Sequence, residues 1–169
     1  ILEEQDKWTC YFLERKELDF YREVTEKLGE KKFHEVASID IGIVTGANKF
    51  FCVDKNTIED RGLDSPNGSL KILPMMGRSN EVDGLQFTEE DYKRNSESGK
   101  RCHMLIFNKG SSKSKMPLNL RKYLNEGEKD GLNERYKSRI RTPWFWIPSV
   151  FPSELSMFKR ASEYTRLIH

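Results

Sequence analysis

The chain has 169 residues, of which 29 are Lys or Arg and 27 are Asp or Glu. Its length fits one domain of about 100–200 residues, and no apolar run approaches the ~20 residues that a membrane-spanning helix requires. Its three cysteines, Cys10, Cys52 and Cys102, lie far apart, which excludes a disulfide framework and favours a reducing compartment. Because the sequence begins at Ile1 and only 36% of its residues are hydrophobic, we expect a piece of a longer protein.

The small net charge of +2 is unevenly distributed along the chain. Residues 1–35 carry a net charge of −3, residues 36–132 carry +1, and residues 133–169 carry +4. A second basic stretch, residues 93–115, holds seven Lys or Arg residues against Glu97 alone. Such stretches suit contact with phosphates, since Lys and Arg displace counterions from nucleic acid. A solvated surface would give the same pattern.

The first half of the chain predicts short elements of both kinds. Residues 10–31 predict a helix, because apolar residues recur at three- and four-residue steps and Gly29 stands at the expected end. Residues 36–53 predict a strand, a tight loop around Gly46 and a second strand, because β-branched residues alternate on one side and an apolar run follows. A short helix (56–63), a loop (64–69) and a short irregular segment containing Pro74 (70–76) are expected next.

The second half continues this mixture. Residues 103–107 predict a strand, and residues 111–115 are expected to be mobile in isolation. A helix is expected from Pro117, with Gly127 and Gly131 ending it. Extended structure over 135–147, a helix over 153–164 and a strand opening at 165–168 complete the series. Without regular βαβ alternation, this order favours an α+β fold with mixed, mainly antiparallel sheets and peripheral helices.

Known catalytic and cofactor patterns are missing from the sequence. The segment from Gly42 to Gly46 matches neither the dinucleotide-binding glycine pattern nor a P-loop. The histidines His34, His103 and His169 have no ligand partner three or four residues away, so we expect no metal site. Residues 126–129, Glu-Gly-Glu-Lys, offer the acids and Lys of a nuclease but stand at a predicted helix end. We therefore expect no self-sufficient active site.

Residues 135–141 are the most informative stretch. In a strand, Arg135, Lys137, Arg139 and Arg141 would share one face and form a basic row. The aromatic residues 144–146 follow directly, and basic side chains beside aromatics suit phosphate contact and base stacking. The alternative is a solvated basic face with Trp144 and Trp146 as core anchors.

Two motifs together resemble a known family. The first is Gly42-Ile43-Val44-Thr45-Gly46-Ala47-Asn48-Lys49-Phe50-Phe51. The second comprises Tyr123-Leu124, Gly127-Glu128, Gly131-Leu132, Arg135-Tyr136, Arg139, Arg141 and Pro143-Trp144. Their order and content resemble the segment after the catalytic domain in N6-adenine DNA methyltransferases of restriction–modification systems, over about residues 36 to 169.

The resemblance implies a DNA-methylase specificity-domain-like fold and a DNA-binding role. Residues 36–169 would form the target-recognition domain, truncated at its C-terminus, and residues 1–35 a connecting helix from an absent N-terminal catalytic domain. The domain would hold duplex DNA while an adenine is flipped into that catalytic domain. The family's cofactor loop and N-P-P-[YF] tetrapeptide do not occur in this sequence, so S-adenosyl-L-methionine and methylation would belong to the parent, a SAM-dependent adenine-specific DNA-methyltransferase.

The residues expected to contact DNA lie in the two motifs and in the stretch between them. The turn supplies donors where a glycine lets the backbone approach a phosphate, and the arginines suit phosphates or the guanine edge. Loops of the variable middle are expected to hold sequence preference. The predicted set is Thr45, Asn48, Lys49, Arg78, Lys113, Lys115, Arg135, Lys137, Arg139, Arg141 and Trp144.

Two other functional classes remain open from the sequence. One is a fragment of a restriction nuclease or nuclease–methylase fusion, which needs clustered carboxylates. The other is a non-catalytic interaction module whose basic row faces an acidic protein. The leading hypothesis places the protein in the prokaryotic cytoplasm with double-stranded DNA as its partner and no membrane contact.

Overall fold

The structure is a computed structural model that describes residues 8–29, 33–64, 68–148, 150–151, 153–159 and 165–169. The chain divides into two compact units, Ile1–Gly42 (unit 1) and Ile43–His169 (unit 2). Mixed helices and small antiparallel sheets confirm the α+β prediction. Among the described residues no helix has the length and apolar character needed to cross a membrane.

Unit 1 contains one long helix, α1 (Arg15–Leu28), preceded by η1 (Trp8–Phe12) and followed by η2 (Phe33–Glu35). At the start of α1, the side chain of Glu17 accepts a hydrogen bond of 2.8 Å from the backbone N–H of Glu14. Gly29, with φ of 67°, ends the helix, because a positive φ costs glycine little. The helix predicted over 10–31 is confirmed only for Arg15–Leu28; residues 10–12 belong to η1, residues 13–14 are not helical, and residues 30–31 lie outside the described residues.

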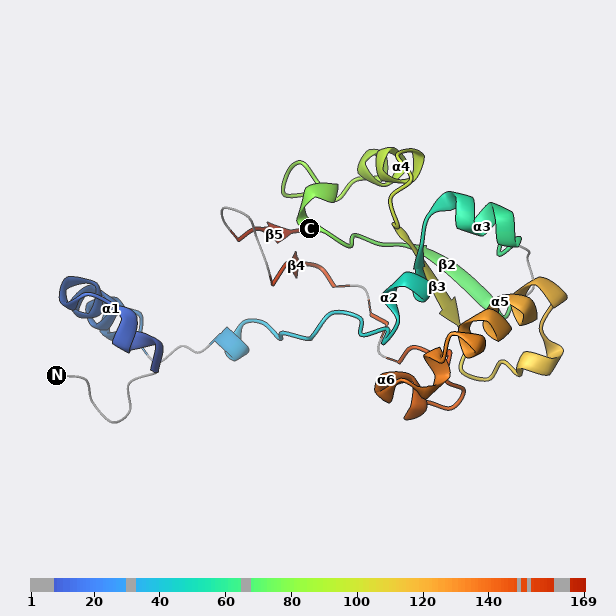
Figure 1. Ribbon diagram of the computed structural model, residues 1–169. Coiled ribbons are helices and arrows are strands. Elements are labelled where there is room, and N and C mark those ends of the chain that lie inside the picture. The colour runs from blue at the N-terminus through green and yellow to red at the C-terminus, as the bar shows by residue number, and fades with distance from the viewer. Residues whose placement is uncertain (1–7, 30–32, 65–67, 149, 152, 160–164) are drawn as a thin grey trace. The chain divides into compact units, whose positions relative to one another are not determined.

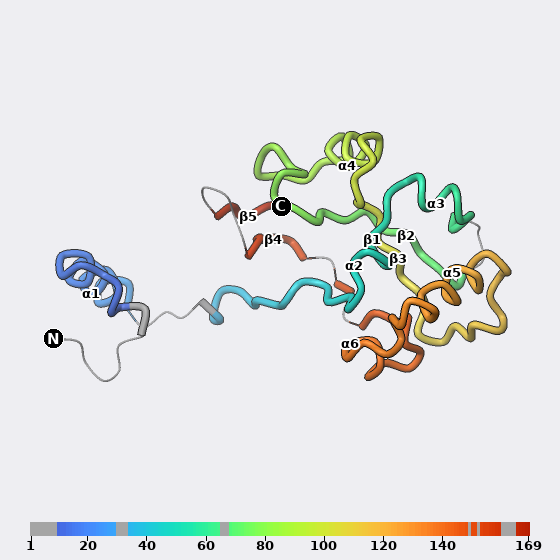
Figure 2. The backbone as a smooth tube through the Cα atoms, viewed as in Figure 1, coloured from blue at the N-terminus to red at the C-terminus, as the bar shows by residue number. Residues whose placement is uncertain are grey.

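Unit 2 is built around β3 (His103–Phe107), which lies beside β2 (Leu70–Pro74) in Figure 1. With β1 (Cys52–Val53) these strands form a three-stranded antiparallel sheet in the order β1-β3-β2. Ile72 of β2 pairs with Leu105, and Cys52 of β1 pairs with Met104. A second, two-stranded sheet joins β4 to β5 (Figure 2). The elements of unit 2 are α2 (Asn48–Phe51), β1 (Cys52–Val53), α3 (Lys55–Arg61), β2 (Leu70–Pro74), η3 (Ser79–Glu81), α4 (Glu89–Glu97), β3 (His103–Phe107), η4 (Lys113–Lys115), α5 (Leu118–Lys129), η5 (Leu132–Glu134), α6 (Tyr136–Arg139), β4 (Ser156–Met157) and β5 (Leu167–Ile168).

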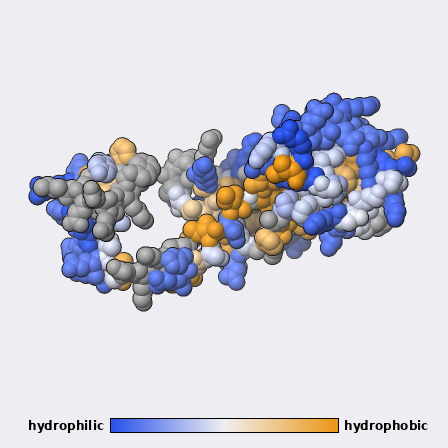
Figure 3. Space-filling view, turned by 90° about the horizontal axis from the view of Figure 1, so that it is seen from below, coloured by the Kyte–Doolittle hydropathy of each residue, from blue (hydrophilic) through white to orange (hydrophobic). Residues whose placement is uncertain are grey.

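The core of unit 2 lies between the three-stranded sheet and α5. Leu120 and Leu124 of α5 and Leu105 and Phe107 of β3 are fully buried in one cluster. The α5 residues on this face follow the three- and four-residue steps of a helix with one apolar side. Polar residues cover much of the surface visible in Figure 3.

Several local predictions are confirmed. The helix expected over 56–63 is α3, which begins after Asp54, whose side chain accepts a 2.8 Å hydrogen bond from the N–H of Thr57. The strand over 103–107 is β3, and the strand at 165–168 is β5. The helix expected from Pro117 is α5, but it continues through Gly127 to Lys129. Gly131, in the left-handed region, follows it.

The predicted strand pair over 36–53 is wrong except at its last two residues. Residues 36–44 form no strand, and Ile39 and Ile41 are 78% and 90% exposed. Residues 48–51 form a helical turn, and only β1 joins the sheet. β-branched residues favour strands only where a partner strand offers hydrogen bonds and packing, and within the described residues no strand pairs with 36–44.

The extended structure predicted over 135–147 is also wrong. Residues 136–139 form the helical turn α6, in which the carbonyl oxygen of Arg135 accepts hydrogen bonds from the N–H groups of Ser138 (2.9 Å) and Arg139 (2.8 Å). The Thr142–Pro143 peptide bond is cis. Arg135, Lys137, Arg139 and Arg141 therefore do not share one strand face.

Two further segments differ from expectation, and two more can be compared with it only in part. Residues 70–74 form a regular edge strand, because Pro74 stands at its end where a missing N–H interrupts no ladder. The helix expected over 153–164 is absent from its described part, where β4 forms instead, and residues 160–164 lie outside the described residues. Residues 111–115, expected to be mobile in isolation, contain η4, and Lys113 pairs with Glu128 of α5 in the fold. Of the loop expected over 64–69, residues 65–67 also lie outside the described residues.

Candidate nucleic-acid interface

The structure brings the two sequence motifs together in unit 2, through segments 44–51 and 135–145. The guanidinium of Arg141 donates hydrogen bonds to the carbonyl oxygens of Thr45 (2.8 Å) and Val44 (2.6 Å). Arg141 is buried, and burial lowers the pKa of its guanidinium, which still carries its charge at neutral pH. We call the two segments 44–51 and 135–145 together the motif junction. Arg141 stabilises it from within, and this differs from the solvent-facing place predicted for it.

The turn before α2 is held closely against α6. Gly46 has a φ of 80°, and a Cβ atom placed on it would lie 2.9 Å from the Cβ of Lys137. Only glycine combines that backbone conformation with so close an approach. Thr45 is buried, and its hydroxyl donates to the side chain of Asn48 and accepts a 3.1 Å hydrogen bond from the N–H of Ala47. Thr45 therefore fixes the turn rather than facing solvent.

Aromatic rings join the motif junction to α5. The Phe50 ring stacks on Tyr123 with centroids 4.4 Å apart, and the Tyr123 hydroxyl donates to the Phe50 carbonyl oxygen at 2.6 Å. Burial raises the pKa of Tyr123, so the hydroxyl keeps the proton it donates. The Trp144 ring packs against the Phe50 ring with centroids 5.6 Å apart, and both rings lie over Gly127.

Glu128 of α5 binds two side chains from other segments, Trp144 and Lys113. One carboxylate oxygen accepts a 3.0 Å hydrogen bond from the indole N–H of Trp144, and the other lies 2.5 Å from the Lys113 ammonium. Desolvation of Glu128 opposes its charged form, but the hydrogen bonds and the charge of Lys113 outweigh it and lower the pKa of Glu128. Lys113 and Trp144, both predicted to contact DNA, are thus engaged by the same carboxylate.

Four basic side chains remain exposed on the motif junction: Lys49, Arg135, Lys137 and Arg139. None of them forms an ion pair with a carboxylate of the described residues. Five cations elsewhere in unit 2 pair with a carboxylate: Lys55, Arg61, Lys93, Arg94 and Lys113. Within the described residues, the motif junction therefore holds four exposed positive charges that no carboxylate neutralises.

The other predicted residues lie apart from this set or beside it. Asn48 is exposed at the start of α2, next to Lys49. Arg78 is exposed immediately before η3, and Lys115 is exposed at the end of η4. No described contact connects Arg78 to the motif junction.

The two carboxylates within residues 126–129 are each engaged by a cation. Glu126 pairs with Arg61, and Glu128 pairs with Lys113. Over the described ranges, no group of three or more His, Cys, Asp or Glu side chains is placed to hold a metal ion. His103 is buried between the hydroxyl groups of Tyr92 and Ser96.

Sequence reasoning missed the basic outer face of α5. Arg121 and Lys122 are exposed there, on the side opposite the buried Leu120 and Leu124. The signal was present, because a helix with one apolar face turns the intervening residues to solvent.

Comparisons with known proteins agree with the motifs. Residues 5–169 match the family model of the type II methyltransferase M.Eco57I, C-terminal domain. The type II methyltransferase M.AccI of Acinetobacter calcoaceticus is 25% identical over 157 residues, which are 92% of this chain and 26% of that protein. The chain thus spans about a quarter of the length of this relative. No solved structure matches. The chain therefore belongs to the family of the M.Eco57I C-terminal domain of type II methyltransferases.

Proposed function

We propose that this chain is the DNA target-recognition region of a site-specific adenine-N6 DNA methyltransferase of a restriction–modification system. The observation that carries the proposal is the group of exposed cations on the motif junction, Lys49, Arg135, Lys137 and Arg139, none of which has a carboxylate partner among the described residues. The family membership and the name of its relative M.AccI support the methyltransferase context.

The motif junction suits the backbone of a duplex. Cations without a carboxylate partner bind phosphates without first losing an ion pair, and each phosphate neutralised releases condensed counterions. Gly46 and the side chain of Thr45 hold the turn that presents Asn48 and Lys49, while Arg141 fixes that turn against α6. Phosphate contacts of this kind set the register of a protein on DNA.

Trp144 has a supporting role in this proposal. Its ring is half-buried against Phe50, and its N–H is engaged by Glu128. Because Phe50 packs against the ring and Glu128 binds its N–H, the ring is not free to stack on a flipped or unpaired base. We therefore assign Trp144 to the support of the motif junction, and not to base stacking.

Methyl transfer belongs, in this proposal, to another part of the parent protein. The 169 residues contain no N-P-P-[YF] tetrapeptide, and the adenine would be flipped into a separate catalytic domain that binds S-adenosyl-L-methionine. Residues 1–35 would connect the two parts, in the prokaryotic cytoplasm.

Binding of the intact protein to a duplex oligonucleotide over a range of salt concentrations tests the proposal. The double variant Lys137→Gln/Arg139→Gln should weaken binding and reduce the slope of log affinity against log salt by about 0.9 for each phosphate that the protein no longer neutralises. The control Lys55→Gln/Lys93→Gln removes the same charge from two exposed, carboxylate-paired lysines. Equal slopes in both double variants would reject the motif junction as the DNA-binding surface.

A further inference from the structure

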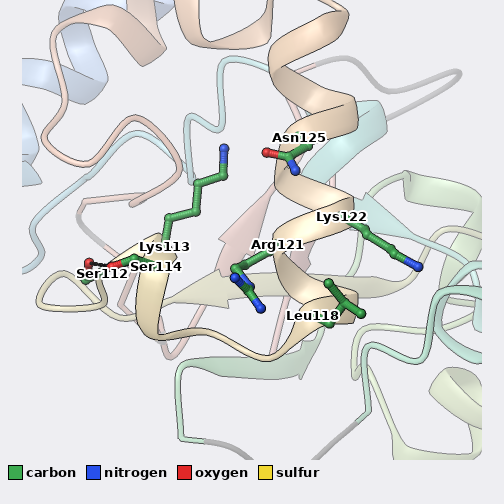
Figure 4. A pocket seen from close by; sticks show the side chains of 7 residues that line it. All are labelled: Ser112, Lys113, Ser114, Leu118, Arg121, Lys122 and Asn125. Atoms are coloured by element: carbon green, nitrogen blue, oxygen red, sulfur yellow. Dashed lines mark hydrogen bonds between the residues drawn. The ribbon is translucent and has the colours of Figure 1, made fainter.

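A hollow on the surface of unit 2 lies between η4 and α5 (Figure 4). It has a volume of about 520 Å³. Its polar lining consists of Ser112, Lys113 and Ser114 from one side and Arg121, Lys122 and Asn125 from α5. All six side chains can donate hydrogen bonds, and none is acidic.

Two of the three cations are available to a ligand. Lys113 is committed to Glu128 at 2.5 Å. Arg121 and Lys122 are exposed, and within the described chain neither forms an ion pair with a carboxylate. The hollow therefore carries uncompensated positive charge next to hydroxyl and amide donors.

The fold presents these side chains without any rearrangement. Arg121 and Lys122 stand four and three residues before Asn125, so the three residues lie together on the outer half of α5. The inner half, with Leu120 and Leu124, is buried in the core. Because burial of that half fixes the rotation of the helix, the basic residues face solvent at a defined position.

The directions of the side chains indicate an extended ligand. In Figure 4 Arg121 reaches toward η4, whereas Lys122 leaves the opposite side of the helix. The hydroxyl groups of Ser112 and Ser114 lie 2.9 Å apart beside η4. A small free anion would need cations that converge on one point. Diverging cations match an anion whose charges are spread along a chain.

We propose that the hollow between η4 and α5 binds the phosphodiester backbone of one DNA strand, with Arg121 and Lys122 contacting separate phosphates. The inference rests on the proposed DNA-binding function and extends its surface from the motif junction along α5. Glu128 links the two places, since it holds Lys113 at the hollow and Trp144 at the motif junction. Ser112, Ser114 and Asn125 supply neutral donors to the same strand.

The test measures duplex affinity of the intact protein across a range of salt concentrations, using Arg121→Gln/Lys122→Gln. With two phosphates no longer neutralised, the slope of log affinity against log salt should fall by about 1.8. Lys55→Gln/Lys93→Gln is the control of equal charge. Urea denaturation of both variants should show wild-type stability, because all four side chains are exposed.

Three outcomes separate this inference from the proposed function. In the first outcome, the salt slope of Arg121→Gln/Lys122→Gln equals that of the control while the slope of Lys137→Gln/Arg139→Gln is reduced. This result would reject DNA binding at the hollow and retain DNA binding at the motif junction. Absence of salt-dependent duplex binding by the wild type overturns both. A titration with inorganic pyrophosphate, followed by NMR of the Arg121 side chain, gives the third. Saturable pyrophosphate binding together with a control-like duplex slope would identify a small-anion site and overturn the assignment to a DNA strand.

Discussion

The indole N–H of Trp144 donates a 3.0 Å hydrogen bond to the carboxylate of Glu128, whose other oxygen holds Lys113 at 2.5 Å. Gly127, directly before Glu128, lies under the rings of Phe50 and Trp144. The Gly-Glu and Pro-Trp pairs of the second motif are therefore partners in one contact, and the Phe-Phe pair of the first motif packs on it.

Removal of the Glu128 carboxylate should destabilise unit 2. In Glu128→Ala the Trp144 N–H and the Lys113 ammonium both lose their acceptor, and we expect the free energy of unfolding to fall by about 1–2 kcal/mol, since the pair is partly exposed. Urea denaturation measures this free energy of unfolding. Glu126→Ala, which breaks a more exposed pair with Arg61, should cost less than about 1 kcal/mol. Equal decreases in the two variants would contradict a structural role for Glu128.

Gly127→Ala should destabilise the protein although alanine favours helices. The new Cβ would lie 2.8 Å from Cε2 of Phe50 and 3.0 Å from Cη2 of Trp144, and such overpacking costs about 1–3 kcal/mol. Thermal denaturation should show a lower midpoint. Gly110→Ala, where nothing lies within 4 Å of the new atom, serves as the control and should stay within about 0.5 kcal/mol of wild type. An unchanged midpoint in Gly127→Ala would show that the rings move aside freely.

Substitution of Arg141 should lower the stability of the protein, whereas substitution of Arg139 should affect DNA binding and not stability. Arg141→Lys loses the fork that reaches two carbonyl oxygens, and we expect a decrease of about 1–3 kcal/mol in the free energy of unfolding. Arg139→Gln removes an exposed charge and should leave stability within about 0.5 kcal/mol. Urea denaturation and duplex binding of both variants check this. Wild-type stability in Arg141→Lys would contradict the stabilising role of the two Arg141 hydrogen bonds.

The stability of unit 2 should decrease at mildly acidic pH because of His103. Its ring nitrogens lie 2.6 Å from the Tyr92 hydroxyl and 3.0 Å from the Ser96 hydroxyl. Burial is the largest influence and lowers the pKa of His103 from its ordinary 6.5, with Lys55 acting in the same direction and Asp54 against it. The unfolded chain then binds the proton more readily. The stability contribution is present above pH 6.5 and is lost as the pH falls from there through the folded pKa.

Unfolding free energies measured from about pH 8 to about pH 5 test this dependence. The wild type should lose stability below pH 6.5, and His103→Gln should lack that component. His34→Gln, at an exposed position of unit 1, should retain it. An identical pH profile in wild type and His103→Gln would assign the decrease to other groups.

Local signals made much of the fold predictable. Asp54 indicates the start of α3 through its capping side chain, and the apolar steps of α5 indicate its buried face. The apolar run of β3 is short, and its bounds follow from the charged and polar residues on either side. In each case the signal and the structure it specifies lie within one element. The two motifs span several elements, but their residues and their order along the chain predicted the family.

The sequence by itself determined the α+β class, the family and the two places where basic residues gather. Only the tertiary structure decided which of those residues face solvent. The spacing of Arg135, Lys137, Arg139 and Arg141 reads as one strand face, yet the carbonyl oxygens of Val44 and Thr45, nearly a hundred residues earlier, bind Arg141 and turn it inward. Likewise residues 36–44 carry strand-forming side chains, but no described strand pairs with them. Propensity and alternation act between neighbours, whereas burial and pairing depend on segments that meet only after the chain has folded.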